Sequence, residues 1–333
     1  MNILVTGGLG YIGSHTILEL SEYSSTIHII DNLSNSSKST LSTLQFLLPS
    51  KKLIFHQGDI QDLSFLSKIF NSYQIDVVFH FAALKSIEQS NKFPHKYYKV
   101  NVIGTQNLIR CMKIAGVKKI IFSSSACVYK RKTEGLYSES CTLGPSSVYG
   151  YTKIWGERIV EEFCSEDNQR SAVVLRYFNP VGAHPSGFLG EDPNGEPGNL
   201  VPCIQKVACG VFRILKIFGS NYNTLDGTAI RDYVHVVDIA KGHALALNKL
   251  ESGVQFYNLG TGIGTSVMEM VRAYEKVSGK FIDFEVRSQR YGDAECVVAD
   301  VKKAEIHLNW KAEKTIEEMC KDSWNYVRKN LSK

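Results

Sequence analysis

A glycine-rich turn near the start of the chain has the spacing of a dinucleotide-binding turn. Residues 6–13 read Thr-Gly-Gly-Leu-Gly-Tyr-Ile-Gly, which places Gly7, Gly10 and Gly13 between an apolar run and a helical stretch. Without a Cβ the backbone can approach a pyrophosphate, and the helix N-terminus offers free N–H groups. Asp31 follows at close to the ~20-residue spacing at which an acid binds the adenosine ribose. The pattern predicts a dinucleotide site and favours NAD over NADP, because the acid would repel a 2′-phosphate. A purely structural glycine turn is the alternative.

A tyrosine and a lysine in the middle of the chain have the spacing of a proton-transfer pair. Tyr149 and Lys153 are four residues apart in a predicted helix, so their side chains share one face. A phenol with a pKa of ~10 needs a pKa about 3 units lower to act as a base near neutral pH, and a neighbouring ammonium and an oxidised nicotinamide both act in that direction. The serine run Ser123-Ser124-Ser125 follows a predicted strand and supplies candidate proton relays. The spacing alone is common on helix surfaces, so this prediction depends on the dinucleotide turn.

These residues require a scaffold of alternating strands and helices. Short β-like runs alternate with helical stretches through the first half of the chain, which predicts βαβ units and an α/β fold with a Rossmann-type, doubly wound parallel sheet. We expect strands at residues 3–5, 27–30, 53–57, 77–81 and 120–123, and helices at residues 11–21, 94–115, 237–250, 266–278 and 315–330.

The composition changes near residue 180. Five of the eight prolines lie between Pro180 and Pro202, among several glycines. Such a stretch cannot form a long helix or a central strand, so we expect an ordered loop that opens a second lobe. The predicted division is an NAD-binding Rossmann domain over residues 1–178 and a smaller C-terminal α/β substrate lobe over residues 179–333, with the chain recrossing near residues 217–245.

Composition and charge exclude several classes of protein. The chain has 333 residues, a net charge of +5 and 44% hydrophobic residues, values typical of a globular protein. The mild charge is spread along the chain, so no nucleic-acid partner is expected, and no apolar run approaches the ~18 residues of a membrane span. The N-terminus has no signal-peptide pattern, and the eight cysteines and nine histidines show no metal-binding spacing. We expect a cytoplasmic protein with reduced cysteines and without a metal or membrane site.

Together these motifs resemble the extended short-chain dehydrogenase/reductase family, most closely its UDP-sugar 4-epimerases. The resemblance extends over essentially the whole chain and is carried by the blocks at residues 7–15, 31–36, 58–60, 80–85, 122–126, 175–184, 190–193, 199–202 and 231–235. It implies an NAD-dependent isomerase of galactose metabolism. Such an enzyme interconverts UDP-glucose and UDP-galactose at C4 through a transient 4-keto sugar. The resemblance also implies a homodimer.

The resemblance implies a role for each matching residue, and it makes residues 179–333 the UDP-sugar-binding lobe. The catalytic residues would be Tyr149, Lys153 and Ser125. NAD would be bound by Gly7, Gly10, Tyr11, Ile12, Gly13, Asp31, Asn32, Asn35, Ser36, Asp59, Ile60, Phe81, Ala82, Lys85, Lys153 and Phe178. The UDP-sugar would be bound by Ser125, Tyr149, Asn179, Asn199, Leu200, Arg231, Arg290 and Asp293.

Three positions depart from the family pattern. Gln289 precedes Arg290 where the family carries a second arginine, and whether Arg287 compensates stays open. Val297 is small at a position where bulk limits the entry of N-acetylated sugars in the family, so activity on UDP-N-acetylhexosamines also stays open. Lys130 replaces a glycine of the family, which leaves the shape of its loop open.

Two other functions use similar motifs. Nucleotide-sugar dehydratases and decarboxylases share the glycine turn and the Tyr–Lys pair, but dehydratases carry an Asp-Glu pair where this chain has Ala126-Cys127. Without those carboxyls an elimination lacks its acid and base. A non-catalytic NAD(P)-sensing regulator on the same fold is expected to lack the Tyr–Lys pair, which this chain retains. Both are therefore less favoured than the epimerase.

Overall fold

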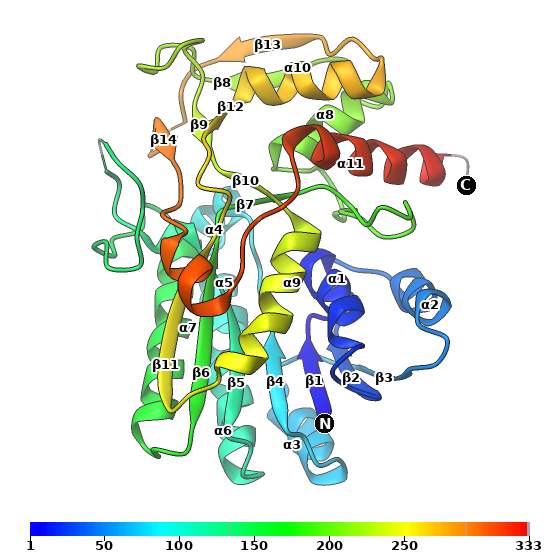
Figure 1. The fold of residues 1–333 in the computed structure, drawn as a ribbon, viewed down its shortest axis with the longest axis vertical. Coiled ribbons are helices and arrows are strands. Elements are labelled where there is room, and N and C mark those ends of the chain that lie inside the picture. Colours follow the sequence, from blue (N-terminus) through cyan, green and yellow to red (C-terminus); the bar gives the residue numbers. More distant parts are fainter. Residues whose placement is uncertain (133, 291, 332–333) are drawn as a thin grey trace.

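The core of the protein is a parallel sheet of seven strands (Figure 1). A computed structural model describes residues 1–132, 134–290 and 292–331. The strand order is β11-β6-β5-β4-β1-β2-β3, which reverses between β1 and β4 as in doubly wound nucleotide-binding folds. The strands are β1 (Asn2–Thr6), β2 (Thr26–Asp31), β3 (Lys52–Gln57), β4 (Val77–His80), β5 (Lys119–Ser125), β6 (Ser171–Tyr177) and β11 (Gly253–Leu259). The predicted fold class is confirmed.

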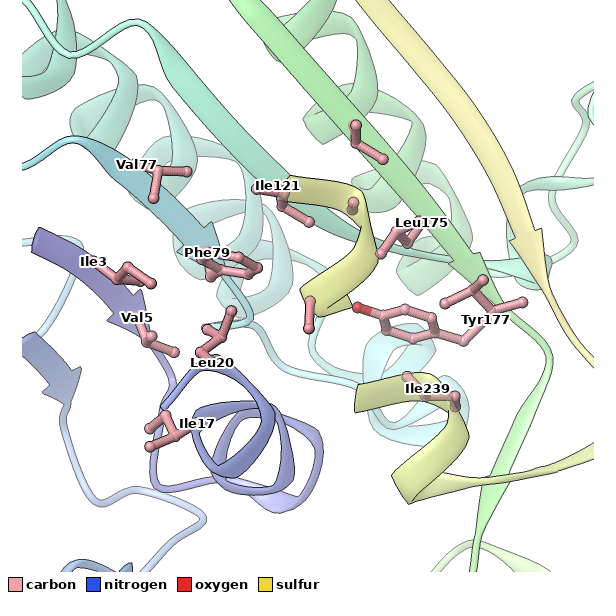
Figure 2. Packing of buried hydrophobic residues seen from close by; sticks show 14 of the residues in the cluster. Ile3, Val5, Ile17, Leu20, Val77, Phe79, Ile121, Leu175, Tyr177 and Ile239 are labelled. Atoms are coloured by element: carbon pink, nitrogen blue, oxygen red, sulfur yellow. The ribbon is translucent and has the colours of Figure 1, made fainter. Parts of the chain in front are cut away.

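Helices cover both faces of this sheet. Successive residues of a strand point to opposite faces, so an apolar strand presents side chains that must be buried on each face. Ile3 and Val5 face α1 (Tyr11–Leu20) and α9 (Val236–Ala246), and Figure 2 shows this packing. Leu4 belongs to the cluster on the other face. That face is covered by α3 (Leu63–Ser72), α6 (Gly104–Ile114) and α7 (Val148–Ser165). Since both faces are buried, the central strands are apolar along their length, which is the pattern that the sequence shows.

A smaller lobe lies beyond the carboxyl ends of the sheet strands (Figure 1). Its helices share a separate hydrophobic core that includes Ile204, Met270 and Met319. The helices of this lobe are α8 (Leu200–Ala208), α10 (Val267–Ser278) and α11 (Ile316–Leu331). Its strands form two small sheets, β8 (Leu215–Phe218) with β13 (Phe284–Arg287), and β9 (Ile230–Arg231) between β12 (Thr265–Ser266) and β14 (Cys296–Val297).

The chain returns from the smaller lobe to the large sheet through α9 and β11. α9 packs against α1, and β11 pairs parallel with β6. Ile217 lies in β8, which pairs with β13 in the smaller lobe, so the return begins at α9 and not near residue 217. β10 (Tyr233–His235), just before α9, pairs with β7 (Asn179–Val181) and joins the two parts of the chain.

The predicted helix at residues 94–115 is interrupted. It consists of α5 (Pro94–Tyr97), a π-helical segment η1 (Tyr98–Ile103) and α6. π-helical segments frequently occur at functional sites, and η1 contains the buried Asn101. The remaining elements are α2 (Lys38–Leu47), α4 (Ile87–Lys92), and the short helices η2 (Ala126–Val128), η3 (Leu247–Lys249) and η4 (Ala304–Leu308). No helix in the described ranges is long and apolar enough to span a bilayer.

Candidate active site

The glycine turn lies at the switch point of the sheet, where β1 and β4 are neighbours. Gly7 has a left-handed φ of 68°, and its N–H donates to the carbonyl oxygen of Ile30 (2.7 Å). A Cβ on Gly7 would lie 2.6 Å from the backbone nitrogen of Ala82, just after β4. A Cβ on Gly13 would overlap the carbonyl oxygen of Gly7. Glycine is therefore required for the two strand ends and α1 to meet this closely.

The N-terminus of α1 is open toward an anion. Gly10 is the N-cap residue, no side chain caps the helix, and its first turn carries no acidic residue. The first N–H groups, including those of Tyr11 and Ile12, have no partner within the helix, and the helix dipole adds positive charge there. This set of donors fits the pyrophosphate of NAD. The Tyr11 hydroxyl donates to the carbonyl oxygen of Gly182 (2.7 Å), which ties α1 to the loop after β7.

Asp31 organises the loop that follows β2. Its carboxylate accepts hydrogen bonds from the backbone nitrogens of Leu9 (3.1 Å) and Leu33 (2.9 Å) and from the Ser36 hydroxyl (2.7 Å). Leu33 has a left-handed φ of 61°, which is rare outside glycine, and the bond to Asp31 holds it there. The carboxylate thus joins this loop to the glycine turn and places negative charge where a 2′-phosphate would be repelled.

The residues assigned to the adenine side lie next to this loop. Asn32 donates from Nδ2 to the Asp59 carboxylate (2.8 Å). Burial would raise the pKa of Asp59, but hydrogen bonds from Gln61 and Asn32 outweigh it and lower the pKa, so the carboxylate stays ionised. Ile60 is buried against Gly104, where a Cβ would lie 2.6 Å from its Cδ1. The structure thus brings the predicted residues of β2 and β3 together.

Tyr149 and Lys153 both lie on the buried face of α7, as their spacing predicts. The Lys153 ammonium is 5.9 Å from the centre of the Tyr149 ring, and it donates to the carbonyl oxygen of Ser123 at the end of β5 (2.7 Å). Ser125 ends the same strand and hydrogen-bonds to Tyr149. The three predicted catalytic residues therefore converge at the carboxyl end of β5, beside the switch point.

Burial has the largest influence on the pKa values of Tyr149 and Lys153. It raises the pKa of Tyr149 more than the hydrogen bond from Ser125 lowers it. Burial also lowers the pKa of Lys153 to about 8, although the Glu157 carboxylate acts in the opposite direction. The lowered tyrosine pKa expected from the sequence is not met by the protein alone, because the cost of burying a phenolate exceeds the effect of the hydrogen bond from Ser125. A positive nicotinamide would add the missing charge.

A buried polar chain that sequence reasoning missed positions this pair. Asn101 in η1 donates from Nδ2 to Thr152 Oγ1 (2.9 Å) and to the carbonyl oxygen of Leu84 (3.0 Å). Thr152 lies between Tyr149 and Lys153 in sequence and donates to the carbonyl oxygen of Tyr149 (2.7 Å). The only sequence signal for this role is a polar residue in a mostly apolar helical stretch.

His80 extends the chain of polar contacts to the glycine turn. Its Nδ1 lies 2.7 Å from Thr6 Oγ1, and its Nε2 lies 2.9 Å from Thr105 Oγ1, which donates to the carbonyl oxygen of Asn101 (2.6 Å). Burial, followed by the charge of Lys153, lowers the pKa of His80 to about 3, so the ring is neutral. His80 therefore links β1, β4 and α6 by hydrogen bonds without adding charge to the site.

A buried ion pair anchors the middle of α7. Arg176 on β6 donates from Nη2 and Nε to the Glu157 carboxylate (2.7 and 2.9 Å), and the Ser124 hydroxyl donates to the same carboxylate (2.5 Å). Both charged side chains are almost completely buried. This pair fixes α7 against β5 and β6, one helical turn beyond Lys153.

The residues assigned to the UDP group gather in the smaller lobe. Arg231 on β9 forms an ion pair with Asp293, and the Arg290 guanidinium lies 3.8 Å from the centre of the Phe218 ring. Burial raises the pKa of the Cys127 thiol, whereas the charges of Arg231 and Lys153 act to lower it. The backbone nitrogen of Cys127 donates to Ser125 Oγ (3.2 Å), so this thiol lies next to the catalytic residues.

Two of the departures from the family pattern acquire a structural context. Arg287 donates from Nε to the Glu285 carboxylate on the exposed strand β13 (2.8 Å), so its guanidinium is paired within that strand. Arg131, which follows Lys130, donates to the carbonyl oxygen of Asp293. A second guanidinium therefore does contact the segment around Asp293, but it comes from Arg131 in the loop after β5. Tyr291 lies outside the described residues.

The remaining predicted residues line the junction of the two lobes. Lys85 donates to the Glu191 carboxylate (2.7 Å), and Asn199 Nδ2 donates to the same oxygen (3.3 Å). Phe178 is buried, and the backbone nitrogen of Asn179 donates to the carbonyl oxygen of Asp232 (2.9 Å). The other four predicted residues follow β2, follow β4 or begin α8. Asn35 Oδ1 accepts a hydrogen bond from the backbone nitrogen of Asn194. After β4, Phe81 packs against His243 and the Ala82 nitrogen donates to the carbonyl oxygen of Thr6, and Leu200 is the first residue of α8.

The described part of the chain holds no group of three or more His, Cys, Asp or Glu side chains that could bind a metal ion.

The chain is similar to proteins of known activity along its whole length. The NAD dependent epimerase/dehydratase family matches residues 3–260. UDP-glucose 4-epimerase 2 of Arabidopsis thaliana is 47% identical, with 99% of this chain and 95% of that protein covered. UDP-glucose 4-epimerase of Bacillus subtilis (strain 168) is also 47% identical, with 100% and 98% covered. The crystal structure of UDP-glucose 4-epimerase from Bifidobacterium longum in complex with NAD⁺ and UDP superposes with a TM-score of 0.96 at 43% identity and covers 99% of both chains.

Proposed function

The chain belongs to the NAD dependent epimerase/dehydratase family, and from this premise we propose the function of the site and the roles of its residues. The protein is an isomerase that interconverts UDP-glucose and UDP-galactose at C4 with NAD as its cofactor. This function rests on one observation. Tyr149, Lys153 and Ser125 lie together beside the glycine turn, where no side chain caps the N-terminus of α1. When bound, NAD supplies the acceptor and donor of the C4 hydrogen, so the cycle has no net redox change.

In this mechanism Tyr149 Oη takes the proton of the sugar 4-hydroxyl and later returns it. The Ser125 hydroxyl hydrogen-bonds to Tyr149 and to the sugar, and the Lys153 ammonium stabilises the phenolate. Asn101 and Thr152 hold the start of α7 in place while the proton moves. Burial of all three catalytic side chains excludes bulk water from the reacting atoms.

The sugar must turn over between the two half-reactions, so binding has to come from the UDP group. Arg231 and Arg290 supply guanidinium groups, which suit a diphosphate. Asp293 orients Arg231, and Asn199 and Leu200 stand at the start of α8. Firm contacts to UDP with few fixed contacts to the sugar would let the 4-keto intermediate rotate in place.

A direct product assay tests the function. Purified protein is incubated with UDP-galactose without added cofactor, and the products are separated chromatographically. UDP-glucose is the expected product, because NAD is expected to co-purify. A dehydratase would instead form a 4-keto-6-deoxy sugar nucleotide, and a sensor would form none. The short helix η2 carries Ala126 and Cys127 where an elimination needs carboxyls, which supports the epimerase.

We also propose that the site accepts UDP-N-acetylhexosamines. Val297 is partly buried and packs against the cluster that contains Phe178 and Tyr129. Its small side chain would leave more space for an N-acetyl group beside this cluster than a bulky residue would. Conversion of UDP-N-acetylgalactosamine in the same assay is the expected result. Val297→Tyr should abolish that conversion and retain the conversion of UDP-galactose. Equal loss of both activities would contradict a role for Val297 in selectivity.

A homodimer is supported by apolar side chains on two neighbouring elements. Tyr98 and Ile103 of η1, and Tyr151 and Trp155 of α7, are between 37% and 53% exposed. Tyr151 and Trp155 are four residues apart and lie on the face of α7 opposite Tyr149 and Lys153. Sedimentation equilibrium should give twice the monomer mass, and Trp155→Glu should weaken the association. A monomer at micromolar concentration would contradict the proposal.

Two further assignments belong to the proposal. The Rossmann domain at residues 1–178 binds NAD and the lobe at residues 179–333 binds the UDP-sugar, with α9 and β11 contributed back to the first domain. A cytoplasmic location is supported by the eight cysteines, all of which are free thiols.

A further inference from the structure

The segment from Glu191 to Asn199 leaves the smaller lobe and contacts the Rossmann domain at two places. The backbone nitrogen of Asn194 donates to Asn35 Oδ1 (3.1 Å), and its Nδ2 donates to the carbonyl oxygen of Ser34 (3.2 Å). Glu191 forms an ion pair with Lys85 (2.7 Å). These partners belong to the loops after β2 and β4, at either side of the switch point. We call residues 191–199 the clasp.

Glu191 contacts both halves of the proposed site. The same carboxylate oxygen that pairs with Lys85 accepts a hydrogen bond from Asn199 Nδ2 (3.3 Å). Asn199 is the N-cap residue of α8, but its side chain does not cap that helix. Its amide is instead directed to Glu191. One carboxylate therefore joins a residue assigned to NAD with a residue assigned to UDP.

The surroundings of Glu191 make this link more than a surface contact. The Glu191 side chain is only 8% exposed, although that of Lys85 is 46% exposed, so solvent screens this pair less than an ion pair in which both side chains are exposed. The Glu191 charge also adds to the effect of burial that raises the pKa of Tyr11, so Glu191 is near the first turn of α1. Along the chain, the clasp thus runs from Glu191 beside the pyrophosphate turn, past the adenosine-ribose loop at Asn194, to Asn199 at the start of α8.

We propose that the clasp encloses the bound dinucleotide, and that Glu191 is a positioning residue that couples the retention of NAD to the binding of the UDP-sugar. The inference rests on the proposed function. For NAD to leave, the clasp must open, which breaks the contacts of Glu191 and Asn194. A UDP group that holds Asn199 fixes the second partner of Glu191 and keeps the clasp closed. By linkage, bound NAD then strengthens the binding of UDP by the same factor.

The test measures the loss of NAD, independently of turnover. NAD-loaded protein is diluted into alcohol dehydrogenase and excess ethanol, so that each released NAD appears as NADH absorbance. The rate is measured with and without saturating UDP. In the wild-type protein UDP should slow the loss at least about fivefold, the lower end of typical couplings. Glu191→Gln should release NAD about tenfold faster, as expected for the loss of a charge-assisted contact, and should reduce the UDP effect to near unity.

Matched variants separate the clasp from general damage. Glu196→Gln makes the same chemical change in the clasp at an exposed glutamate that has no ion pair with any residue described, and it should behave as wild type. Asn194→Ala removes the contact with Ser34 and should speed the loss of NAD about threefold. The unfolding temperature of each variant shows whether it is folded.

The outcomes distinguish the two proposals. Wild-type protein that cannot be loaded with NAD would overturn the proposed function. NAD-loaded protein that shows no UDP effect, or a Glu191→Gln variant that keeps the wild-type ratio of rates, would overturn the coupling and leave the function intact. A change in the UDP effect for Glu191→Gln but not for Glu196→Gln would support the clasp.

Discussion

At the scale of single residues, the site is governed by how burial and charge compete. Tyr149 sits where burial raises its pKa, so the protein alone keeps it as a phenol. Lys153 is held close by the carbonyl oxygen of Ser123, and a bound positive nicotinamide would add to its effect. Proton abstraction by Tyr149 is therefore expected to depend on the loaded cofactor, which couples the base to the redox partner.

Replacing Tyr149 tests its role directly. Tyr149→Phe removes the proton acceptor and keeps the ring that packs at the start of α7. We expect turnover to fall by roughly 10²- to 10⁴-fold. The NAD content of the purified protein, measured by absorbance after denaturation, should stay unchanged. Turnover close to wild type would exclude Tyr149 as the base.

The pH dependence of turnover should report Lys153. Because burial lowers its pKa to about 8, the ammonium is present below that pH and is lost above it. The stabilisation of the phenolate is therefore lost in the same direction, and kcat should decline as pH rises through about 8. The profile is measured from pH 6 to 10 with circular dichroism as a control for folding. A flat profile in folded protein would contradict this assignment.

At the scale of elements, α7 is the helix that carries the chemistry, and it is fixed at two levels. Asn101 in η1 holds its first turn through Thr152, and Arg176 on β6 holds its middle through Glu157. Lys153 lies between these attachments. The Arg176–Glu157 pair adds little net stability compared with apolar residues of similar volume. Removing either partner, however, would leave the other as an unpaired buried charge.

Breaking this pair should therefore destabilise the protein strongly. Glu157→Gln leaves Arg176 without its counter-charge, and we expect the free energy of unfolding to fall by about 3–5 kcal/mol in urea titrations. Glu161→Gln on the same helix removes an exposed pair with Arg158 and should cost at most about 1 kcal/mol. Similar losses in the two variants would show that the buried pair is not what anchors α7.

At the scale of the whole molecule, several buried histidines are kept neutral. Burial lowers the pKa of His15 and His80 to about 3 and that of His243 to about 4, against 6.5 in the unfolded chain. Between these values only the unfolded state binds the protons. The contribution of these neutral histidines to the free energy of unfolding is therefore fully present above about pH 6.5 and is lost as the pH falls toward 4.

This predicts a steep loss of stability in mild acid. The urea midpoint should fall between pH 7 and pH 5, with each such histidine contributing up to about 1.4 kcal/mol per pH unit. His243→Gln should reduce the steepness of this pH dependence by the contribution of one proton. A midpoint independent of pH would contradict the neutral state of these histidines.

Local patterns in the sequence determined the scaffold and the chemistry it carries. The glycine spacing and Asp31 predicted the dinucleotide turn, and the interval between Tyr149 and Lys153 predicted a shared helix face. These features depend on residues near each other in the chain, where the helical and strand periods fix which side chains meet. The alternation of strands and helices likewise predicted the fold class, which is confirmed.

Only the tertiary structure decided which distant residues meet. Lys85 meets Glu191, His80 and Asn101 connect the glycine turn to α7, and Arg131 rather than Arg287 contacts the Asp293 segment. The return of the chain at α9, and not near residue 217, was decided in the same way. Such pairings join residues far apart in sequence, and no local period records them. They arise because the strand order and the packing of the two lobes bring particular loops to the same edge of the sheet.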